Sequence, residues 1–417
     1  MAEEVDEMTE SSKSRSSVRP ESALPLRDWI LLPVLSLLTM GLLTCTVELT
    51  ARRLFSVTQS TVFNCIVTDD PSTGFRAIPN CVCRQKHMES QLVEYRFNNC
   101  GLRADKQCAA KPPKSYRIVL LGSSIVTGLM VPRENSFAAL LAPEIASRGL
   151  PSVEVYNEGM MAETPATIAL RIRDVLATKP DMIVWGLTPW DLQHASVVLP
   201  QLPKMAPKGA FMRSTRRRIR EAFATGSVQV MLKGLLQTFQ DLTDGSWWGT
   251  KLMLRYIFYQ SQSQYLKLYL RDGEDAGFLK DPPGPEWLAY LHDFDNSDTA
   301  IARQVSAAGI PMVAVLLPYR AQTAMISKGE WPAGYDPYKL DNELRRIVES
   351  HGGIYITILP DYRSIPNPEQ EFFPVDGHPN PEGHARIANL LAKQLTNGVL
   401  PADRVASPRQ VTSGLGR

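Results

Sequence analysis

The sequence has few cysteines, few histidines and almost no net charge. Six cysteines and six histidines occur among 417 residues, and the formal net charge at pH 7 is +2. The near-neutral charge creates no field that would favour nucleic acid or a strongly acidic partner. No Cys-x-x-Cys pair occurs, which disfavours a zinc site, although the pair Cys81 and Cys83 leaves that alternative open. No cysteine follows Cys108.

One uncharged apolar segment stands out near the amino terminus. Residues 29–47 carry no charge, and as a helix rising roughly 1.5 Å per residue they nearly span a hydrocarbon core of about 30 Å. We therefore expect a transmembrane helix at 29–47, preceded by a disordered tail at 1–28 that is rich in Glu, Ser and Arg. A cleaved signal peptide is the alternative, but the apolar stretch is long for one and no Ala-x-Ala-like site follows it.

The orientation in the membrane depends on charge and on cysteine placement. Basic residues flank both ends of the apolar segment, and their bias slightly favours a cytoplasmic amino terminus. Five cysteines cluster on the far side: Cys65, Cys81, Cys83, Cys100 and Cys108. Such clustering suggests disulfides in an oxidising space, with one cysteine unpaired and the pairing left open. We predict a single-pass protein of the inner (cytoplasmic) membrane whose main domain is periplasmic.

Short apolar strands alternate with amphipathic helices from residue 116 onward. The strands expected from their β-branched runs are 118–121, 153–157, 181–186, 310–317 and 354–358. Helical patterns occur at 165–177, 298–308, 340–350 and 381–395, and a pattern that resumes at Gly128 predicts a helix directly after the first strand. This alternation predicts an α/β fold with a doubly wound parallel sheet.

The predicted domains follow from these patterns. Residues 48–115 form a membrane-proximal, cysteine-bearing lead-in, 116–396 the α/β domain, and 397–417 a tail. The rhythm breaks between 200 and 285, where a basic run and apolar-aromatic stretches predict a helical insertion. The insertion is either a lid, or a surface for anionic headgroups or a partner, or a small helical subdomain with a solvated charged face. Its aromatic residues either stack on sugars or pack in the core.

The serine pair at the end of the first strand is the strongest candidate for chemistry. Ile118 to Leu121 end in Gly122, Ser123 and Ser124, which predicts a strand, a tight turn and a helix start. Such a turn places a serine at the carboxyl edge of the sheet, close to helix N–H groups that stabilise negative charge. The alternative is that these small residues merely form the turn.

A nucleophilic serine needs a histidine base and a group that orients it. Only His378 stands in a turn-rich loop with a carboxylate, Asp376, two residues before it. Because the loop after the last strand returns to the edge that holds the first turn, Ser124 and His378 can meet. The alternatives are that His378 caps the next helix, or that Asp376, His378 and His384 bind a metal, although no further His or Cys has suitable spacing.

Four ordered motifs carry a family resemblance. Residues 122–128, 157–159, 186–191 and 376–384 resemble the blocks of the SGNH (GDSL-like) hydrolase superfamily. The resemblance covers roughly residues 115–395, and residues 97–103 are similar to a stretch in membrane-anchored bacterial members. It implies a three-layer α/β/α, flavodoxin-like fold that acts on acyl esters without metal or cofactor. It also implies Ser124 as nucleophile, His378 as base and Asp376 as orienter.

The chain departs from the family pattern at three places. Ser123 replaces an acidic residue, the Asp-to-His gap is two residues instead of three, and Trp190 replaces the asparagine that supplies an oxyanion donor. The resemblance then implies oxyanion donors from Ser124, from Gly159 or Ala162, and from the Thr188 hydroxyl. Loss of one donor costs about a hundredfold to a thousandfold in rate, which predicts low activity or an unusual substrate.

Three functions follow from the resemblance. The first is a membrane-anchored, extracytoplasmic serine esterase that hydrolyses O-acyl esters, above all O-acetyl esters of cell-envelope carbohydrate. The second is an O-acyltransferase that uses the same serine beside a membrane acyl donor protein, with water excluded. The third is an inactive scaffold that binds envelope polysaccharide or a partner, suggested by Trp190.

Overall fold

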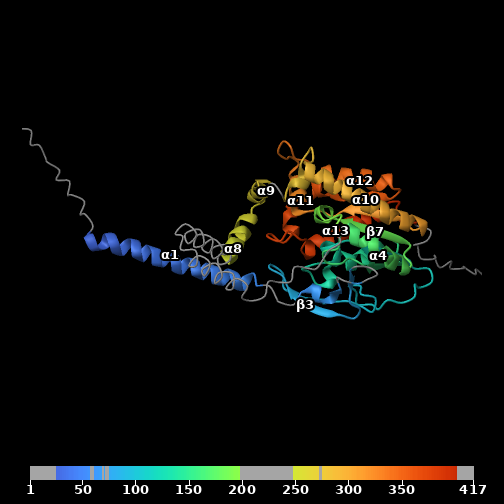
Figure 1. The fold of residues 1–417 in the computed structure, drawn as a ribbon, viewed down its shortest axis with the longest axis horizontal. Helices are drawn as coiled ribbons and strands as arrows, with labels where there is room; N and C mark the ends of the chain where they lie inside the picture. Colours follow the sequence, from blue (N-terminus) through green and yellow to red (C-terminus); the bar gives the residue numbers. More distant parts are fainter. Residues whose placement is uncertain are drawn as a thin grey trace, which may run out of the picture.

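The fold is that of a computed structural model, which describes residues 25–56, 61–67, 70, 75–197, 248–271 and 275–401. One long helix extends away from a compact α/β body (Figure 1). Most of the predicted tails, the basic run at 204–220 and the first apolar stretch of the insertion lie outside the described residues.

The body is built on a five-stranded parallel sheet. Its spatial order is β6-β5-β7-β8-β9, the flavodoxin-like order 2-1-3-4-5. The strands are β5 (Tyr116–Leu121), β6 (Val153–Asn157), β7 (Met182–Leu187), β8 (Met312–Leu316) and β9 (Ile354–Ile356). Every residue of β5, β7 and β8 is buried, as expected where helices cover both faces of a parallel sheet. The predicted doubly wound sheet is thus confirmed.

Helices cover the sheet in two layers (Figure 1). α3 (Phe137–Ser147) packs on α13 (Pro381–Thr396), and α10 (Pro285–Ala307) packs on both α4 (Pro165–Ala177) and α12 (Lys339–Ser350). Right-handed crossovers in this strand order place these two sets on opposite faces, which gives three layers. The other α-helices among the described residues are α1 (Leu26–Leu54), α2 (Ser124–Thr127), α5 (Pro189–Gln193), α8 (Trp248–Tyr259), α9 (Gln262–Arg271) and α11 (Arg320–Lys328).

One predicted element needs correction. The continuous helix expected after the serine turn is two helices, α2 and α3. Gly128 and Met130 both adopt positive φ, at 79° and 69°, and this left-handed backbone ends α2 after one turn. The helical pattern therefore resumes only at Phe137.

The lead-in folds as a small β-unit on the carboxyl edge of the sheet. It contains the pair β1 (Ile66–Val67) and β2 (Arg76–Ala77) and the hairpin β3 (Val82–Lys86) and β4 (Leu92–Arg96). Its apolar core includes residues from the loops that follow β5 and β6, namely Leu129, Met130, Met160 and Met161. The lead-in is thus packed against the loops next to the serine turn.

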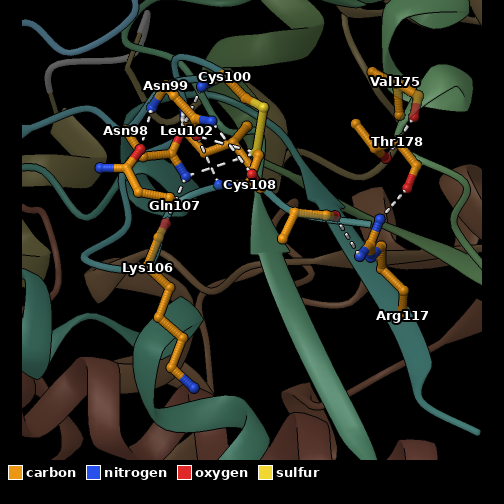
Figure 2. The surroundings of a disulfide bond; sticks show 11 residues. Asn98, Asn99, Cys100, Leu102, Lys106, Gln107, Cys108, Arg117, Val175 and Thr178 are labelled. Carbon is orange, nitrogen blue, oxygen red and sulfur yellow. Dashed lines mark hydrogen bonds between the residues drawn. A yellow bond between two sulfur atoms is a disulfide. The ribbon is translucent and has the colours of Figure 1, made fainter. Parts of the chain in front are cut away.

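Two disulfides cross-link the lead-in. Cys65 pairs with Cys81 and Cys100 pairs with Cys108, which resolves the pairing left open by the sequence. Asn99 accepts the N–H of Cys108 beside the second bridge (Figure 2). Cys83 is free and buried, and burial raises the pKa of its thiol to about 11. This thiol is therefore protonated and unreactive at neutral pH.

Arg103 fastens the lead-in to the turn that carries Ser124. Its guanidinium is almost completely buried and donates to the carbonyl oxygens of Thr127, Gly128 and Val131, at 2.5 to 2.8 Å. It also lies 4.4 Å from the ring centroid of Tyr95. These contacts compensate much of the cost of burying the charge.

Replacing Arg103 with alanine should destabilise the fold. Three carbonyl groups would lose a charged donor, so we expect the free energy of unfolding to fall by about 3 kcal/mol. Urea unfolding followed by tryptophan fluorescence measures it. Arg84→Ala is the control, because Arg84 is largely exposed and pairs only with Glu94 at the surface. Equal stability of the two variants would contradict the role of Arg103.

A buried carboxyl group lies in α10. Asp298 is inaccessible to solvent, and neither of its oxygens has a hydrogen-bond partner among the described residues. Burial raises the pKa of Asp298 from 3.8 to about 7; Asp295 raises it further and His351 lowers it. The folded state therefore binds a proton between about pH 4 and 7 that the unfolded state has released, and the contribution of Asp298 to stability falls as pH rises across that window.

Asp298→Asn should remove this pH dependence. We expect the variant to exceed the parent in free energy of unfolding by about 2 kcal/mol at pH 8 and to match it near pH 4. Urea titrations at both pH values test this. Asp174→Asn, at an exposed site on α4, should leave the parent's curve unchanged. A stability difference between Asp298→Asn and the parent that is the same at pH 4 and pH 8 would exclude the effect of Asp298.

The long helix α1 is long and apolar enough to cross a membrane. Its apolar side chains are exposed, among them Leu38 and Leu42. At its carboxyl end, Glu48 accepts the N–H groups of Gly249 and Thr250 and the Thr250 hydroxyl, at 2.7 to 3.1 Å. Because these N–H groups begin α8, Glu48 caps that helix and joins α1 to the insertion.

Candidate active site

Ser124 lies where β5 turns sharply into α2. Gly122 has φ +140°, and a Cβ at this position would collide with the carbonyl oxygen of Gly186 in β7. Only glycine allows the two strand ends to approach this closely. The chain winds in opposite directions from β5 to β6 and from β6 to β7, so Ser124 stands at the switch point of the sheet, where α/β folds place ligands.

Three of the predicted site residues form a hydrogen-bonded chain. Ser124 Oγ lies 2.7 Å from Nε2 of His378, and Nδ1 of His378 lies 2.5 Å from Oδ1 of Asp376. The Asp376 side chain is 9% exposed. Although burial opposes the shift, the charge of His378 and its hydrogen bond hold the pKa of Asp376 below its ordinary value. Asp376 therefore stays ionised beside the histidine.

The short spacing from Asp376 to His378 is accommodated by the backbone of the loop between them. Gly377 has φ +86° and donates its N–H to the carbonyl oxygen of Phe373 at 2.9 Å. Phe373 in turn donates its N–H to the carbonyl oxygen of His378 at 2.9 Å. This tight turn brings the Asp376 carboxylate next to Nδ1 of His378, so a spacing of two residues is enough for the hydrogen bond between them.

The second motif holds the loop after β6 against α2. Asn157 donates its amide to the carbonyl oxygen of Val126 and accepts the N–H of Gly159, both at 3.0 Å. The N–H of Gly159 is therefore already engaged. Ala162 has a left-handed φ of +59°, and among the described residues neither its N–H nor that of Ser124 has a hydrogen-bond acceptor.

The third motif is organised around a buried carboxyl group. The N–H and the hydroxyl of Thr188 both donate to Oδ2 of Asp191, at 2.7 and 2.8 Å. Burial raises the pKa of Asp191 to about 7. Trp190 stacks on His194 with 4.2 Å between ring centroids. The hydroxyl proton of Thr188 is therefore committed to Asp191 and is not free for a substrate.

A cavity of about 260 Å³ opens beside His378 and Asp376. The insertion supplies one wall, with Arg255 from α8 and tyrosines from α8 and α9. The aromatic side chains that line it are Trp190, Tyr259, Tyr265, Tyr269, Phe278 and Tyr319. Several of these also pack on one another, as Tyr265 does on Tyr259 at 5.1 Å. A cavity of this size suits a small acyl group or a single ring.

His384 is a structural residue. It is fully buried, accepts the N–H of Phe137 at 3.2 Å and stacks on the Phe137 ring. Burial, together with the charges of Arg103 and His378, lowers the pKa of His384 to about 3, so it is neutral. The alternative of a metal site at Asp376, His378 and His384 finds no support, because no His, Cys, Asp and Glu cluster in the described part of the chain could hold a metal ion.

Sequence reasoning missed two neighbours of Asp376, both in the turn of the lead-in hairpin. Glu89 accepts the N–H groups of Val375 and Asp376, and Nδ1 of His87 lies 3.4 Å from Oδ2 of Asp376. Nearly 290 residues separate Glu89 from the loop. No local motif marks this turn, and a single sequence carries no signal for so distant a contact.

Comparisons with known proteins give structural likeness only. No protein-family model matches the chain, and no curated protein matches it in sequence. A catalytic mutant of an acetylxylan esterase from Geobacillus stearothermophilus is 10% identical, with a TM-score of 0.36, over 69% of this chain and 96% of that one. A GDSL-like lipase from Bacteroides thetaiotaomicron is 12% identical, with a TM-score of 0.33, over 70% and 93%.

A third solved structure shows a similarly low likeness to this chain. The psychrotrophic esterase EstA from Pseudoalteromonas sp. is 11% identical, with a TM-score of 0.33, over 68% of this chain and 97% of that one. At this level of likeness we argue function from the side chains of the site.

Proposed function

We propose that this protein is a membrane-anchored, extracytoplasmic serine esterase that hydrolyses small O-acyl esters. The observation that carries the proposal is the chain of hydrogen bonds from Ser124 through His378 to Asp376. Serine becomes nucleophilic only when a base removes its proton, and this arrangement supplies both the base and the group that orients it.

In the acylation step, the hydroxyl oxygen of Ser124 attacks the ester carbonyl carbon. Nε2 of His378 takes the hydroxyl proton, and Asp376 stabilises the resulting imidazolium. The tetrahedral intermediate then expels the alcohol, which receives that proton from His378. The acyl group remains on Ser124, so one ester bond has broken and one has formed.

Deacylation repeats these steps with water. His378 takes a proton from water, the hydroxide attacks the acyl-serine carbonyl carbon, and the serine oxygen leaves with the proton. We assign the oxyanion donors to the N–H groups of Ser124 and Ala162, because Gly159 donates to Asn157 and Thr188 donates to Asp191. Two donors preserve the main electrostatic contribution without the asparagine that Trp190 replaces.

The substrate class follows from the cavity and the anchor. A volume of about 260 Å³ favours a short acyl chain such as acetyl, and its aromatic wall suits a sugar ring. The helix α1 and the paired cysteines support an anchored, extracytoplasmic domain. O-acetyl groups of cell-envelope carbohydrate meet all of these conditions.

The deciding experiment uses the full chain in detergent with a fluorophosphonate, which phosphonylates activated serines. We expect one adduct by intact mass, mapped to the peptide that contains Ser124. A folded protein that gains no adduct would contradict the proposal and favour an inactive binding scaffold.

Product analysis then separates hydrolysis from transfer, since both pass through the same acyl-serine. The enzyme is given p-nitrophenyl acetate with and without an oligosaccharide acceptor. Free acetate alone is the expected product of an esterase. Detection of an acetylated acceptor would contradict the esterase proposal and show that the protein is an acyltransferase.

A further inference from the structure

The turn of the lead-in hairpin contacts the loop that carries Asp376. This turn joins β3 to β4 and comprises residues 87–91. The hydroxyl of Ser90 accepts the N–H of His87 at 3.1 Å and lies within 3.0 Å of the His87 carbonyl oxygen, which fixes the turn. Two of its side chains, those of His87 and Glu89, point to the acid of the proposed triad.

Glu89 forms hydrogen bonds with the backbone of Asp376 and of the residue before it. Its Oε2 atom accepts the N–H of Val375 at 2.9 Å and the N–H of Asp376 at 2.8 Å, and Oε1 also lies 3.1 Å from the N–H of Val375. Hydrogen bonds from backbone N–H groups to a carboxylate are charge-assisted and short. They fix the position of the Asp376 Cα atom relative to the hairpin.

His87 faces the side chain of the same residue. Nδ1 of His87 lies 3.4 Å from Oδ2 of Asp376, while Oδ1 of Asp376 bonds to His378. The two oxygens of one carboxylate therefore face two different histidines. Nδ1 of His87 is buried and forms no full hydrogen bond with any described residue. A small movement of the His87 ring toward Asp376 would form a hydrogen bond between Nδ1 and Oδ2.

We propose that the hairpin turn positions the triad, with His87 donating its Nδ1–H to Oδ2 of Asp376 and Glu89 fixing the backbone of that residue. This role rests on the proposed esterase function. A carboxylate held at both oxygens cannot rotate about its χ2 bond, so Oδ1 stays aligned with the Nδ1–H of His378. That alignment keeps the histidine in the tautomer whose Nε2 accepts the serine proton.

The charges around His87 are compatible with a neutral imidazole. The groups that face it are Asp376 and His378 from the acid loop and Lys86 from its own strand, and Arg320 of α11 faces Glu89. Burial lowers the pKa of His87, and the charges of His378 and Lys86 lower it further, although Asp376 opposes this. A neutral histidine can donate Nδ1–H without neutralising the carboxylate that His378 needs.

The same hairpin also contacts the carboxyl end of α1. Nζ of Lys86 donates to the carbonyl oxygens of Leu54 and Ser56, at 3.2 and 3.0 Å. Leu54 is the last residue of α1. The end of this hairpin thus contacts α1 through Lys86 and the loop of Asp376 through His87 and Glu89, which gives the triad a defined place relative to α1.

The test compares His87→Leu with His87→Asn in the full chain in detergent, with p-nitrophenyl acetate as substrate. The asparagine amide places a donor near the position of Nδ1, whereas leucine removes it. We expect His87→Leu to lower kcat about tenfold with KM unchanged, because misaligned catalytic groups lose rate more than binding. His87→Asn should stay within about threefold of the parent. His292→Leu, at an exposed histidine of α10, is the matched control.

A second readout does not depend on turnover. The proton that His378 shares with Asp376 should give a low-field proton NMR signal in the parent and in His87→Asn, and this signal should broaden in His87→Leu. An unchanged signal and unchanged kcat in folded His87→Leu would overturn the positioning role. Absent turnover in the parent, with the NMR difference retained, would reject the esterase function and leave the positioning of Asp376 supported.

Discussion

Replacing Ser124 with alanine is expected to remove ester turnover, with kcat falling by about a millionfold, as in serine hydrolases that lose their nucleophile. The variant keeps His378 and Asp376 but has no oxygen that can form the acyl intermediate. Only the oxyanion donors and substrate binding remain, and these leave a small residual acceleration over water. Initial rates on p-nitrophenyl acetate and the mass of the fluorophosphonate adduct measure the loss.

Ser123→Ala is the matched control, because it removes the same hydroxyl group one residue earlier. Ser123 is buried, and its Oγ atom has no hydrogen-bond partner among the described residues. We expect it to retain labelling and turnover within a few-fold of the parent, because the Ser123 hydroxyl is not part of the chain of hydrogen bonds from Ser124 through His378 to Asp376. An adduct that survives in Ser124→Ala and disappears in Ser123→Ala would move the nucleophile by one residue.

Local pattern was sufficient to predict most of the fold. The run at 118–121 and the β-branched runs after it lie in strands of the sheet, and the helix expected at 165–177 has the same bounds as α4. Continuous apolar runs identify the strands because these are buried on both faces, and the 3.6-residue period identifies α4 because it is buried on one face. The single helix expected after Ser124 was wrong, because Gly128 ends α2 as a left-handed C-cap and Met130, a non-glycine residue, adopts a second positive φ two residues later.

The site was predictable to the extent that topology fixes it. Ser124 and His378 meet because both end up at the carboxyl edge of one parallel sheet. The oxyanion donors that we propose could not be chosen from the sequence, because the choice depends on whether each hydrogen is already bonded. Asn157 takes the N–H of Gly159, and Asp191 takes the hydroxyl of Thr188. Such pairings exist only once the chain has folded.

Asp376→Asn is the second change for which we expect a large effect, a fall in kcat of about 10³-fold to 10⁴-fold with KM nearly unchanged. The carboxylate accepts the Nδ1–H of His378 at 2.5 Å. An asparagine amide can instead donate to Nδ1, and this favours the tautomer that carries its proton on Nε2. That tautomer cannot take the proton of Ser124, even though every atom of the site stays in place.

The pH dependence distinguishes this loss from unfolding. The pKa of Asp376 lies below its ordinary value, so the interactions of its carboxylate with His378 stabilise the parent above about pH 4, and this stability is lost as pH falls through the folded pKa. Asp376→Asn should therefore be less stable than the parent at pH 7 and should approach it in acid. Asp361→Asn, which changes only the contacts of Asp361 with Lys393 and Gln394, far from the site, should change the rate little and the stability by less than about 1 kcal/mol. If Asp376→Asn turned over ester at the parental rate, Asp376 would not orient His378, and the role would pass to another carboxylate near the loop, for which Glu89 is the first candidate.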